Sequence, residues 1–186
     1  MDLRIRNLSR LAAAAIAAIL AACAALGPRA PGFTLTDDSG RPWALDRQRG
    51  NPVVLTFGFT HCADTCPETL AKLARLRRTL GAGAGNVRIA MVSVDPRRDT
   101  PAVLHRFVGQ FDGPVVGLTG APADVATVES AYHVWAQRVP GRARRAGTYD
   151  VVHSAIIYFI DPRGTIRDIS DDGASDATLA HAMTRL

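Results

Sequence analysis

The sequence predicts one α/β domain with a mixed central sheet, flanking helices and added β-hairpins. Compact runs of apolar and β-branched residues at 53–59 and 87–94 are typical of strands buried within a sheet. Helical patterns follow both runs, and this alternation is typical of an α/β domain. The turn at 161–164 joins two further strand-like runs, so part of the sheet is expected to be antiparallel.

Length and composition agree with a single domain. The chain has 186 residues, 47% hydrophobic and 21% charged, which excludes wholesale disorder. It has only three cysteines, too few for a disulfide-stapled small fold and an odd number. At least one cysteine is therefore expected to have a role outside a pair.

Residues 1–22 resemble an export signal. Three arginines lie within the first ten residues, and twelve apolar residues follow at 11–22. This length fits a secretory signal better than a full membrane span. The ending Leu-Ala-Ala-Cys23 resembles the bacterial lipobox, which predicts a lipid-anchored Cys23 facing the periplasm or the cell exterior. The alternatives are ordinary cleavage at an Ala-rich site, or retention of the segment as a short anchor. All three place the remaining cysteines in an oxidising compartment.

The net charge carries little functional information. The formal charge is +5, but residues 1–22 hold three Arg and one Asp, so the exported part keeps only +3. It shows neither a helix-turn-helix nor a zinc-finger spacing. We therefore expect no nucleic-acid partner.

The remaining elements follow a regular order. A linker at 23–32 precedes a domain at 33–186. Strands are expected at 33–36, 42–45, 53–59, 87–94, 115–118, 151–160 and 165–169, and helices at 67–80, 101–111, 123–134 and 176–186. An Arg- and Gly-rich loop is expected at 138–147. A hairpin, then βαβ units, then a hairpin and a closing helix is the order of a thioredoxin-like fold.

The second and third cysteines lie where the buried strand 53–59 leads into a helix. Thr65 and Glu68 fit a capping box; alternatively Cys66 is the cap and Pro67 the first helical residue. Either arrangement places Cys66 in the first helical turn, where free N–H groups and the helix dipole favour its thiolate. Thiolates attack disulfides and bind soft metals.

Three interpretations of Cys62 and Cys66 remain open from spacing alone. The pair could be a structural disulfide, although a strand-to-helix junction is an unusual place for one. It could be a thiol–disulfide redox pair, as at thioredoxin-like active sites. It could also hold copper, because two soft sulfurs suit Cu(I) and an added imidazole would complete a set that also holds Cu(II).

Three motifs are similar to those of the Sco/SenC family. They are Phe-Gly-Phe-Thr-His-Cys62-Ala-Asp-Thr-Cys66-Pro at 57–67, Val-Asp-Pro-Arg-Arg-Asp-Thr-Pro at 94–101, and Tyr-Asp-Val-Val-His153-Ser at 149–154. The resemblance covers residue 33 to the C-terminus. It implies a membrane-tethered, thioredoxin-like copper protein that helps build the binuclear copper centre of cytochrome c oxidase. It also implies that Cys62, Cys66 and His153 are the copper ligands.

Two positions depart from the family pattern. Ala63 stands where the family commonly has Pro, which affects the loop but removes no ligand. Val152 stands where an acidic residue commonly precedes the histidine. If that carboxylate tunes the metal site or partner docking, its role is altered here, and whether Asp150 replaces it is left open.

Other polar residues are expected to have structural roles. His61 adjoins Cys62 and is assigned a supporting or exposed position, while His105, His133 and His181 are expected on the surface. Asp95, Arg98 and Asp99 follow a strand end, and we interpret them as helix-capping and ion-pairing residues. Arg142, Arg144 and Arg145 are interpreted as part of a solvated loop, with an acidic partner or anionic lipid as the alternative.

The resemblance therefore predicts a copper chaperone whose recipient is the copper-binding subunit of cytochrome c oxidase. A copper donor and a thiol reductant are its other expected partners. The alternative is an exported thiol–disulfide oxidoreductase that uses Cys62 and Cys66. A peroxidase is disfavoured because the junction lacks a clear Thr-x-x-Cys signature.

Overall fold

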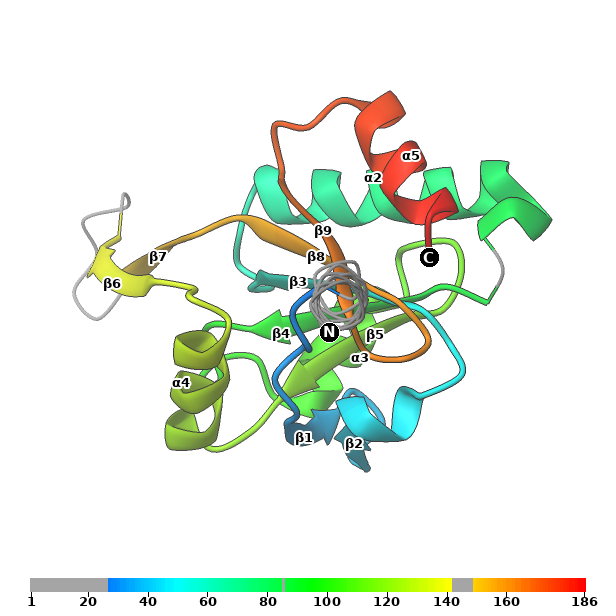
Figure 1. The fold of residues 1–186 in the computed structure, drawn as a ribbon. Helices are drawn as coiled ribbons and strands as arrows, with labels where there is room; N and C mark the ends of the chain where they lie inside the picture. Colours follow the sequence, from blue (N-terminus) through cyan, green and yellow to red (C-terminus); the bar gives the residue numbers. More distant parts are fainter. Residues whose placement is uncertain (1–26, 85, 142–148) are drawn as a thin grey trace, which may run out of the picture.

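The most apolar strands of the sequence form the centre of a seven-stranded mixed sheet (Figure 1). The computed structural model describes residues 27–84, 86–141 and 149–186. The order in the sheet is β2-β1-β5-β4-β3-β8-β9, and β6 and β7 form a separate hairpin. The strands are β1 (Thr34–Asp37), β2 (Pro42–Ala44), β3 (Val53–Gly58), β4 (Arg88–Ser93), β5 (Val115–Thr119), β6 (Ala136–Pro140), β7 (Tyr149–His153), β8 (Ile156–Ile160) and β9 (Ile166–Asp171). The expected α/β fold with a mixed sheet is confirmed.

The three central strands β3, β4 and β5 run parallel, and antiparallel β8 and β1 flank them. All six residues of β3 are buried, as are five of the six in β4. A strand covered on both faces has no exposed positions that need polar residues. This explains why the sequence of each strand is a continuous, mostly apolar run.

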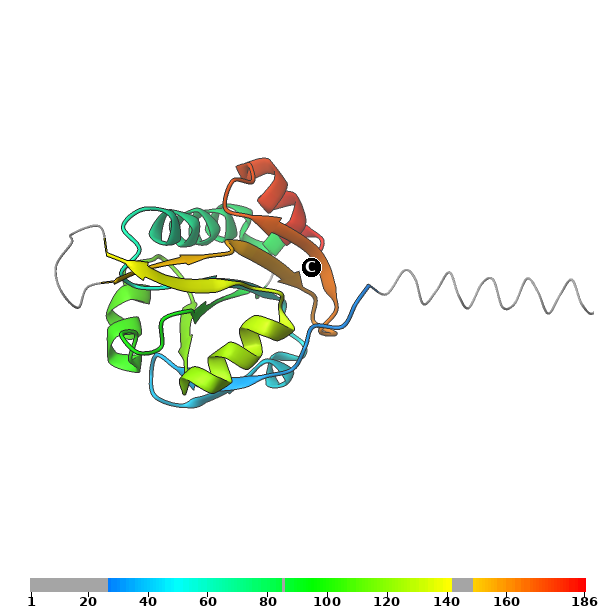
Figure 2. The same cartoon turned by 90° about the vertical axis from the view of Figure 1, so that its left-hand side faces the viewer.

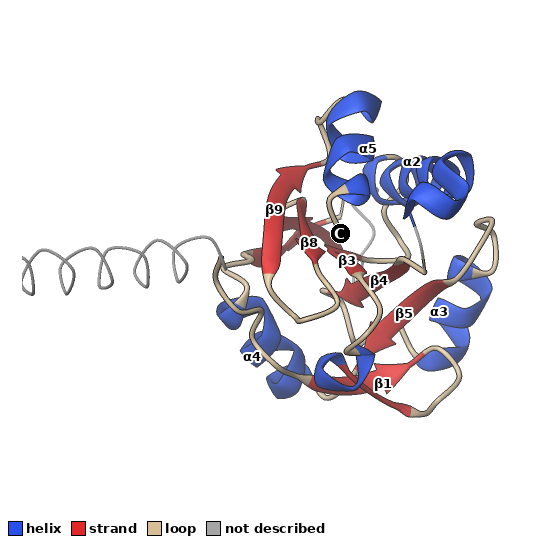
Figure 3. Cartoon of the chain, turned by 45° about the vertical axis from the view of Figure 1, so that its right-hand side comes forward, coloured by secondary structure: helices blue, strands red, loops and turns tan. Residues whose placement is uncertain are grey.

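Helices cover both faces of the sheet (Figure 3). On one face, α2 (Thr65–Leu80), α3 (Pro101–Val108) and α5 (Asp176–Thr184) bury apolar side chains in a common cluster. On the other face, α4 (Pro122–Ala131) packs with residues of β1, β2 and the 3-10 turn η1 (Leu45–Gln48). A second 3-10 turn, η2 (Gly81–Ala84), follows α2. Both faces of the central strands are thereby removed from water.

The hairpin of β6 and β7 corrects two predictions from the sequence. The expected strand at 151–160 is two strands, because the chain leaves the hairpin after His153 and joins the main sheet at Ile156. The predicted loop at 138–147 begins within β6, where Arg138 pairs with Val151. Strand β6 carries no apolar alternation and is largely exposed, so the sequence gives no strand pattern there. The hairpin extends to one side of the fold in Figure 1, and its strands lie in front of the sheet in Figure 2, which looks from that side.

Helix α4 is shorter than the predicted helix at 123–134. It ends at Ala131, and His133 adopts a positive φ of 52°. The side chains of Tyr132 and Val134 are nevertheless buried. Their burial continues the apolar pattern beyond the helix, and this explains the overestimate.

The N-terminal end of the described chain is attached to the start of β9. Ala30 N–H donates to the carbonyl of Gly164 at 2.9 Å, and Ile166 N–H donates to that of Pro28 at 2.9 Å. Arg29 thus forms an isolated antiparallel bridge with Thr165. We call residues 28–30 and 164–166 the N-terminal clasp. It lies at the Val53 end of β3, because Val53 pairs with Ile160 at the end of β8.

Within the described ranges, no helix is long and apolar enough to cross a membrane. The predicted signal at 1–22 and the predicted lipidation site Cys23 lie outside the described residues.

Substitution of Leu73 tests the packing of α2 on the sheet. It is completely buried, so we expect Leu73→Ala to lower the free energy of unfolding by about 2–5 kcal/mol. Arg75→Ala on the same helix removes only an exposed ion pair with Asp176 and should cost less than about 1 kcal/mol. Urea unfolding of both variants measures the difference, and equal losses would contradict the described orientation of α2.

Candidate metal centre

Cys62 and Cys66 lie on either side of the start of α2. The loop after β3 turns at Phe59, whose carbonyl accepts the N–H of Cys62 at 3.3 Å. The N–H of Cys66 then donates to the sulfur of Cys62 at 3.4 Å. Among the described residues neither cysteine forms a disulfide.

The cap of α2 differs from both predicted arrangements. The helix begins at Thr65, and its N-cap residue Asp64 makes no side-chain capping bond. The Cys62 sulfur instead accepts an N–H group of the first turn. The predicted capping box of Thr65 and Glu68 and the predicted cap at Cys66 are therefore both wrong. A sulfur held by a helix N–H occupies the place that a Ser or Asp oxygen fills in an ordinary cap.

His153 meets Cys66 across 87 residues of sequence. Its Nε2 lies 3.6 Å from the Cys66 sulfur, while its Nδ1 lies 3.0 Å from the carbonyl of Ser154. A carbonyl can only accept a hydrogen bond, so Nδ1 carries the ring proton. In the neutral form of the ring, this proton position leaves the lone pair on Nε2, the nitrogen that lies nearer the sulfur. This is how a carbonyl partner fixes the tautomer of a metal-binding histidine.

The position of His153 is fixed on both sides. Its ring packs edge-on against Phe59 of the cysteine loop, with ring centroids 5.8 Å apart. The next residue, Ser154, donates its N–H to the Trp135 carbonyl at 2.8 Å and accepts the Trp135 N–H at 3.1 Å. The ring is thus held between the cysteine loop and the base of the hairpin.

The two thiols differ in their protonation. A hydrogen bond from the Cys66 side chain, with further N–H groups of the first turn, lowers the pKa of Cys62 to about 5. The same thiol–thiol hydrogen bond and burial raise the pKa of Cys66. The sequence predicted the thiolate at Cys66, and this was wrong. The helix N-terminus does stabilise a thiolate, but the sulfur that receives its N–H belongs to Cys62.

The three side chains provide a soft donor set in which two of the three pairs are in contact. The Cys66 thiol hydrogen-bonds to Cys62 and lies 3.6 Å from Nε2 of His153, so Cys66 is the common member. In the part of the chain that the structure describes, no three His, Cys, Asp or Glu side chains yet stand in a metal-binding arrangement. Two sulfurs and one imidazole nitrogen suit copper in either oxidation state.

An open groove of about 470 Å³ lies between the cysteine loop and the hairpin. Cys62 and Ala63 line one side, and Asp150 and Val152 line the other. Both departures from the family pattern thus face the groove beside Cys62. Asp150 and Val152 lie two residues apart on β7 and therefore share one face of that strand.

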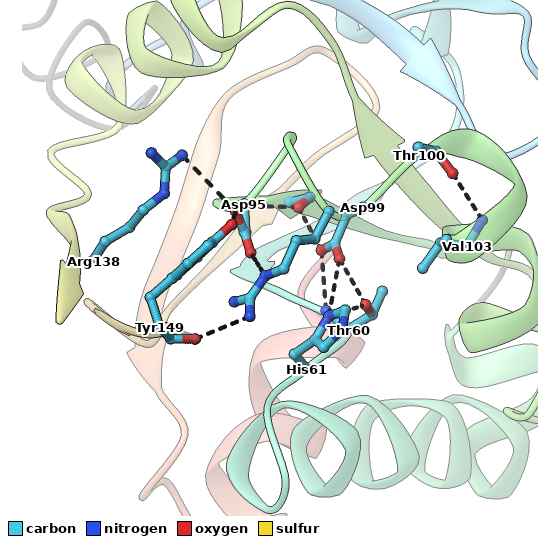
Figure 4. A network of polar contacts seen from close by, with 10 residues as sticks. Thr60, His61, Asp95, Asp99, Thr100, Val103, Arg138 and Tyr149 are labelled. Atoms are coloured by element: carbon cyan, nitrogen blue, oxygen red, sulfur yellow. Dashed lines mark hydrogen bonds and ion pairs between the residues drawn. The ribbon is translucent and has the colours of Figure 1, made fainter. Parts of the chain in front are cut away.

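A buried carboxylate, Asp99, is hydrogen-bonded to the cysteine loop (Figure 4). Asp99 is fully buried and accepts the Thr60 N–H at 3.0 Å and the Thr60 hydroxyl at 2.6 Å. The hydroxyl of Ser93, the last residue of β4, donates to it at 2.6 Å. Burying a carboxylate is costly unless donors surround it. Asp99 therefore fixes Thr60, two residues before Cys62.

A second buried carboxylate supports the hairpin (Figure 4). Asp95 is fully buried, pairs with the guanidinium of Arg98 and accepts the Tyr149 hydroxyl at 2.8 Å. Arg98 also donates to the Tyr149 carbonyl at 3.0 Å and lies 3.8 Å above the Tyr149 ring. Arg138 of β6 approaches Asp95 at 3.9 Å. Both strands of the hairpin are thus attached to the end of β4.

The interpretation of Asp95 and Arg98 as an ion pair holds, and Thr100 caps α3 through a bond to the Val103 N–H at 3.4 Å. The sequence did not single out Thr60, Phe59 or Tyr149. All three lie inside the quoted motifs, and a polar or aromatic residue next to a candidate ligand is the signal that could have identified them.

The other histidines do not join the cysteines. His61 is half exposed, and its Nδ1 faces the Thr60 hydroxyl at 3.1 Å and Asp99 at 3.8 Å. His105 pairs with Asp38 at 2.9 Å on the surface, and His133 and His181 are exposed. These placements agree with the expected exposed or supporting roles. The arginines at 142, 144 and 145 lie outside the described residues.

Comparison with known proteins identifies one family. The profile described as SCO1/SenC matches residues 26–186. The mitochondrial SCO2 homolog of Bos taurus is 36% identical over 155 residues, covering 82% of this chain and 58% of that protein. The SCO2-like protein of Rickettsia felis is 33% identical over 132 residues, covering 71% of this chain and 64% of that protein. The chain thus spans less than two thirds of the length of these relatives.

Solved structures agree with this assignment. The copper-bound ScoI of Arabidopsis thaliana superposes with a TM-score of 0.78 at 29% identity, covering 85% of this chain and 97% of that one. The copper-bound ScoI of Bradyrhizobium japonicum gives 0.75 at 34% identity, covering 85% and 99%. The likeness confirms the predicted thioredoxin-like fold.

The unequal pKa values of the two cysteines predict selective alkylation. Because the Cys62 thiolate persists down to about pH 5, iodoacetamide should label Cys62 at a nearly constant rate from pH 8 to about pH 6. The rate should fall as the pH drops through about 5, and Cys66 should react far more slowly throughout. Peptide mass spectrometry measures both rates. The unfolded protein is the control, because both cysteines should then titrate near their ordinary value of about 8.5.

Because Tyr149 attaches the hairpin to Asp95, we predict that Tyr149→Phe lowers the protection of nearby amides against hydrogen exchange. This change removes the hydroxyl bond to buried Asp95, and a bond to a charged group contributes about 1.5–3 kcal/mol. Amides of β7 should therefore exchange about 10–100 times faster with deuterium. Tyr158→Phe is the matched control, because its hydroxyl bonds the Tyr132 carbonyl away from the hairpin. Equal exchange of β7 amides in both variants would contradict the anchoring role of Tyr149.

Proposed function

We propose that this chain, which belongs to the SCO1/SenC family, is a copper chaperone that delivers copper to the copper-binding subunit of cytochrome c oxidase. Cys62 and Cys66 bind the ion as thiolates, and His153 supplies the nitrogen ligand. Copper is cargo in this proposal, so the site must both hold it and release it.

The observation that carries the proposal is the approach of His153 to Cys66. The Nε2 lone pair lies 3.6 Å from the sulfur, and the carbonyl of Ser154 holds the proton on the other nitrogen. A structural disulfide between Cys62 and Cys66 would not require an imidazole beside it. Two cysteine sulfurs and an oriented imidazole fit the donor preferences of copper. Copper-bound relatives of the same fold support the choice of metal.

The open groove supports release. Cys62 lines it, so the proposed ion is reachable from the groove at the Cys62 sulfur. A recipient thiol or imidazole can therefore approach the ion from the groove and replace the ligands one at a time. A structural site that is closed on all sides resists such exchange.

We further propose that Cys23 carries a lipid anchor and that the domain works at the outer face of a bacterial membrane. The basic and apolar pattern of residues 1–22 supports this placement. A separate copper donor and a thiol reductant belong to the same proposal, because cysteines in an oxidising compartment bind Cu(I) only when reduced.

Thiol–disulfide exchange is the second candidate function. Cys62 has a lowered pKa and Cys66 a raised one, and both are free, as an attacking and a buried resolving thiol would be. This chemistry does not need His153. Substitution of His153 can therefore distinguish the two functions.

Copper titration of three variants tests the chaperone. Cys62→Ser and Cys66→Ser should each lose tight Cu(I) binding, because one thiolate cannot replace two. His153→Ala should weaken Cu(II) more than Cu(I), since the imidazole is the harder ligand. His181→Ala, an exposed histidine on α5, is the control and should bind both ions normally. Undiminished Cu(I) affinity in Cys66→Ser would refute the assignment.

A paired activity assay separates the two functions. Wild type loaded with copper should transfer it to a purified copper-binding domain of the oxidase, and His153→Ala should transfer less from the Cu(II) form. The metal-free protein should reduce a model disulfide only slowly. Fast disulfide turnover that His153→Ala leaves unchanged, without copper transfer, would instead establish the oxidoreductase.

A further inference from the structure

A buried methionine lies next to the candidate ligand Cys66. Met91 is in the middle of β4, only 1% exposed, and faces the same side of the sheet as α2. A Cβ atom on Gly58 would lie 3.1 Å from the Met91 sulfur and 3.2 Å from the Cys66 sulfur. Both sulfurs therefore pack closely against Gly58, and a side chain at that position would crowd them.

A small cavity lies beside Cys66. Its volume is about 10 Å³, enough for one water-sized particle, and Cys66, Met91 and His153 all line it. One thiol, one thioether and one imidazole are thus among the groups that line a space large enough for a single ion. We call this cavity the inner cavity, to distinguish it from the open groove beside Cys62.

We propose that Met91 is an additional, soft ligand for Cu(I), which binds the reduced ion on the inner side of Cys66. Thioethers bind Cu(I) strongly in preference to harder ions such as Zn²⁺. The unbranched Met side chain has three rotatable bonds, so its sulfur can move toward an ion bound at Cys66 without movement of the strand. This inference rests on the proposed copper function and adds selectivity for the reduced ion.

A second buried methionine provides a matched control. Met183 in α5 is also 1% exposed and belongs to the same apolar cluster, but it does not line the inner cavity. Exchanges of Met for Leu conserve volume and usually cost less than about 1.5 kcal/mol. Met91→Leu and Met183→Leu therefore remove one sulfur each with similar effects on packing.

Cu(I) affinity, measured by competition with a chromophoric chelator under reducing conditions, is the first test. We expect Met91→Leu to weaken Cu(I) binding about tenfold and to leave Zn²⁺ binding unchanged. Met183→Leu should leave both unchanged. Equal Cu(I) affinity in the two variants would overturn the role of Met91, and so would parallel losses for both ions in Met91→Leu.

Selenium labelling tests the ligand directly in a protein that keeps Met91. The chain has three methionines, at 1, 91 and 183, so Met91 is the sole methionine of Met183→Leu once residues 1–22 are removed. Copper-edge X-ray absorption of the selenomethionine-labelled, Cu(I)-loaded variant should show a copper–selenium neighbour. Its absence, with copper bound, would overturn the inference even if Met91→Leu folds poorly. Tight Cu(I) binding by Cys66→Ser would instead show that the proposed copper function itself is wrong.

Discussion

Two carboxylates without access to water, Asp95 and Asp99, hold the site together. Each lies just after β4, and each must be surrounded by donors because an isolated buried charge is very costly. Asp99 accepts hydrogen bonds from Thr60 and Ser93. Asp95 pairs with Arg98 and accepts a hydrogen bond from Tyr149. The first set fixes the cysteine loop, and the second fixes the strand that ends at His153. Because each buried carboxylate requires these donors, the two networks together position proposed ligands that lie far apart in the sequence.

The two cysteines have different surroundings although only three residues separate them. Cys62 lines the open groove and receives a helix N–H, whereas Cys66 is buried and contacts both Cys62 and the imidazole. Cys62 is thus the sulfur that a partner reaches, and Cys66 is the sulfur that the fold protects. A carrier of a reactive ion benefits from this division, because one ligand can leave while the other still holds the ion.

Local patterns in the sequence predicted most of the fold but not the contacts that assemble the site. The central strands and α2 were identified because burial on both faces and helical periodicity are local signals. The turn after Asp161 was identified as well, and Gly164 adopts the positive φ of 79° expected there. Strand β6 was missed because three of its five residues are exposed and its sequence has no alternation of apolar and polar residues. The thiolate was assigned to Cys66 because sequence cannot show which sulfur accepts the helix N–H. The approach of His153 to Cys66 depends on packing across 87 residues, and only the family resemblance indicated it.

The N-terminal clasp determines which end of the domain faces an anchoring surface. Residues 28–30 join the fold beside the β8–β9 turn, whereas β3 leads away from that end toward the cysteines. The six residues of β3 alone separate the two ends by about 20 Å, at about 3.3 Å per residue. If the domain is attached to a surface through the residues before Gly27, the cysteines thus lie at the end of the domain opposite that surface. If the proposed lipid anchor holds the domain, a recipient in the same membrane would have to extend its own metal site outward by a comparable height, or the domain would have to tilt to reach it.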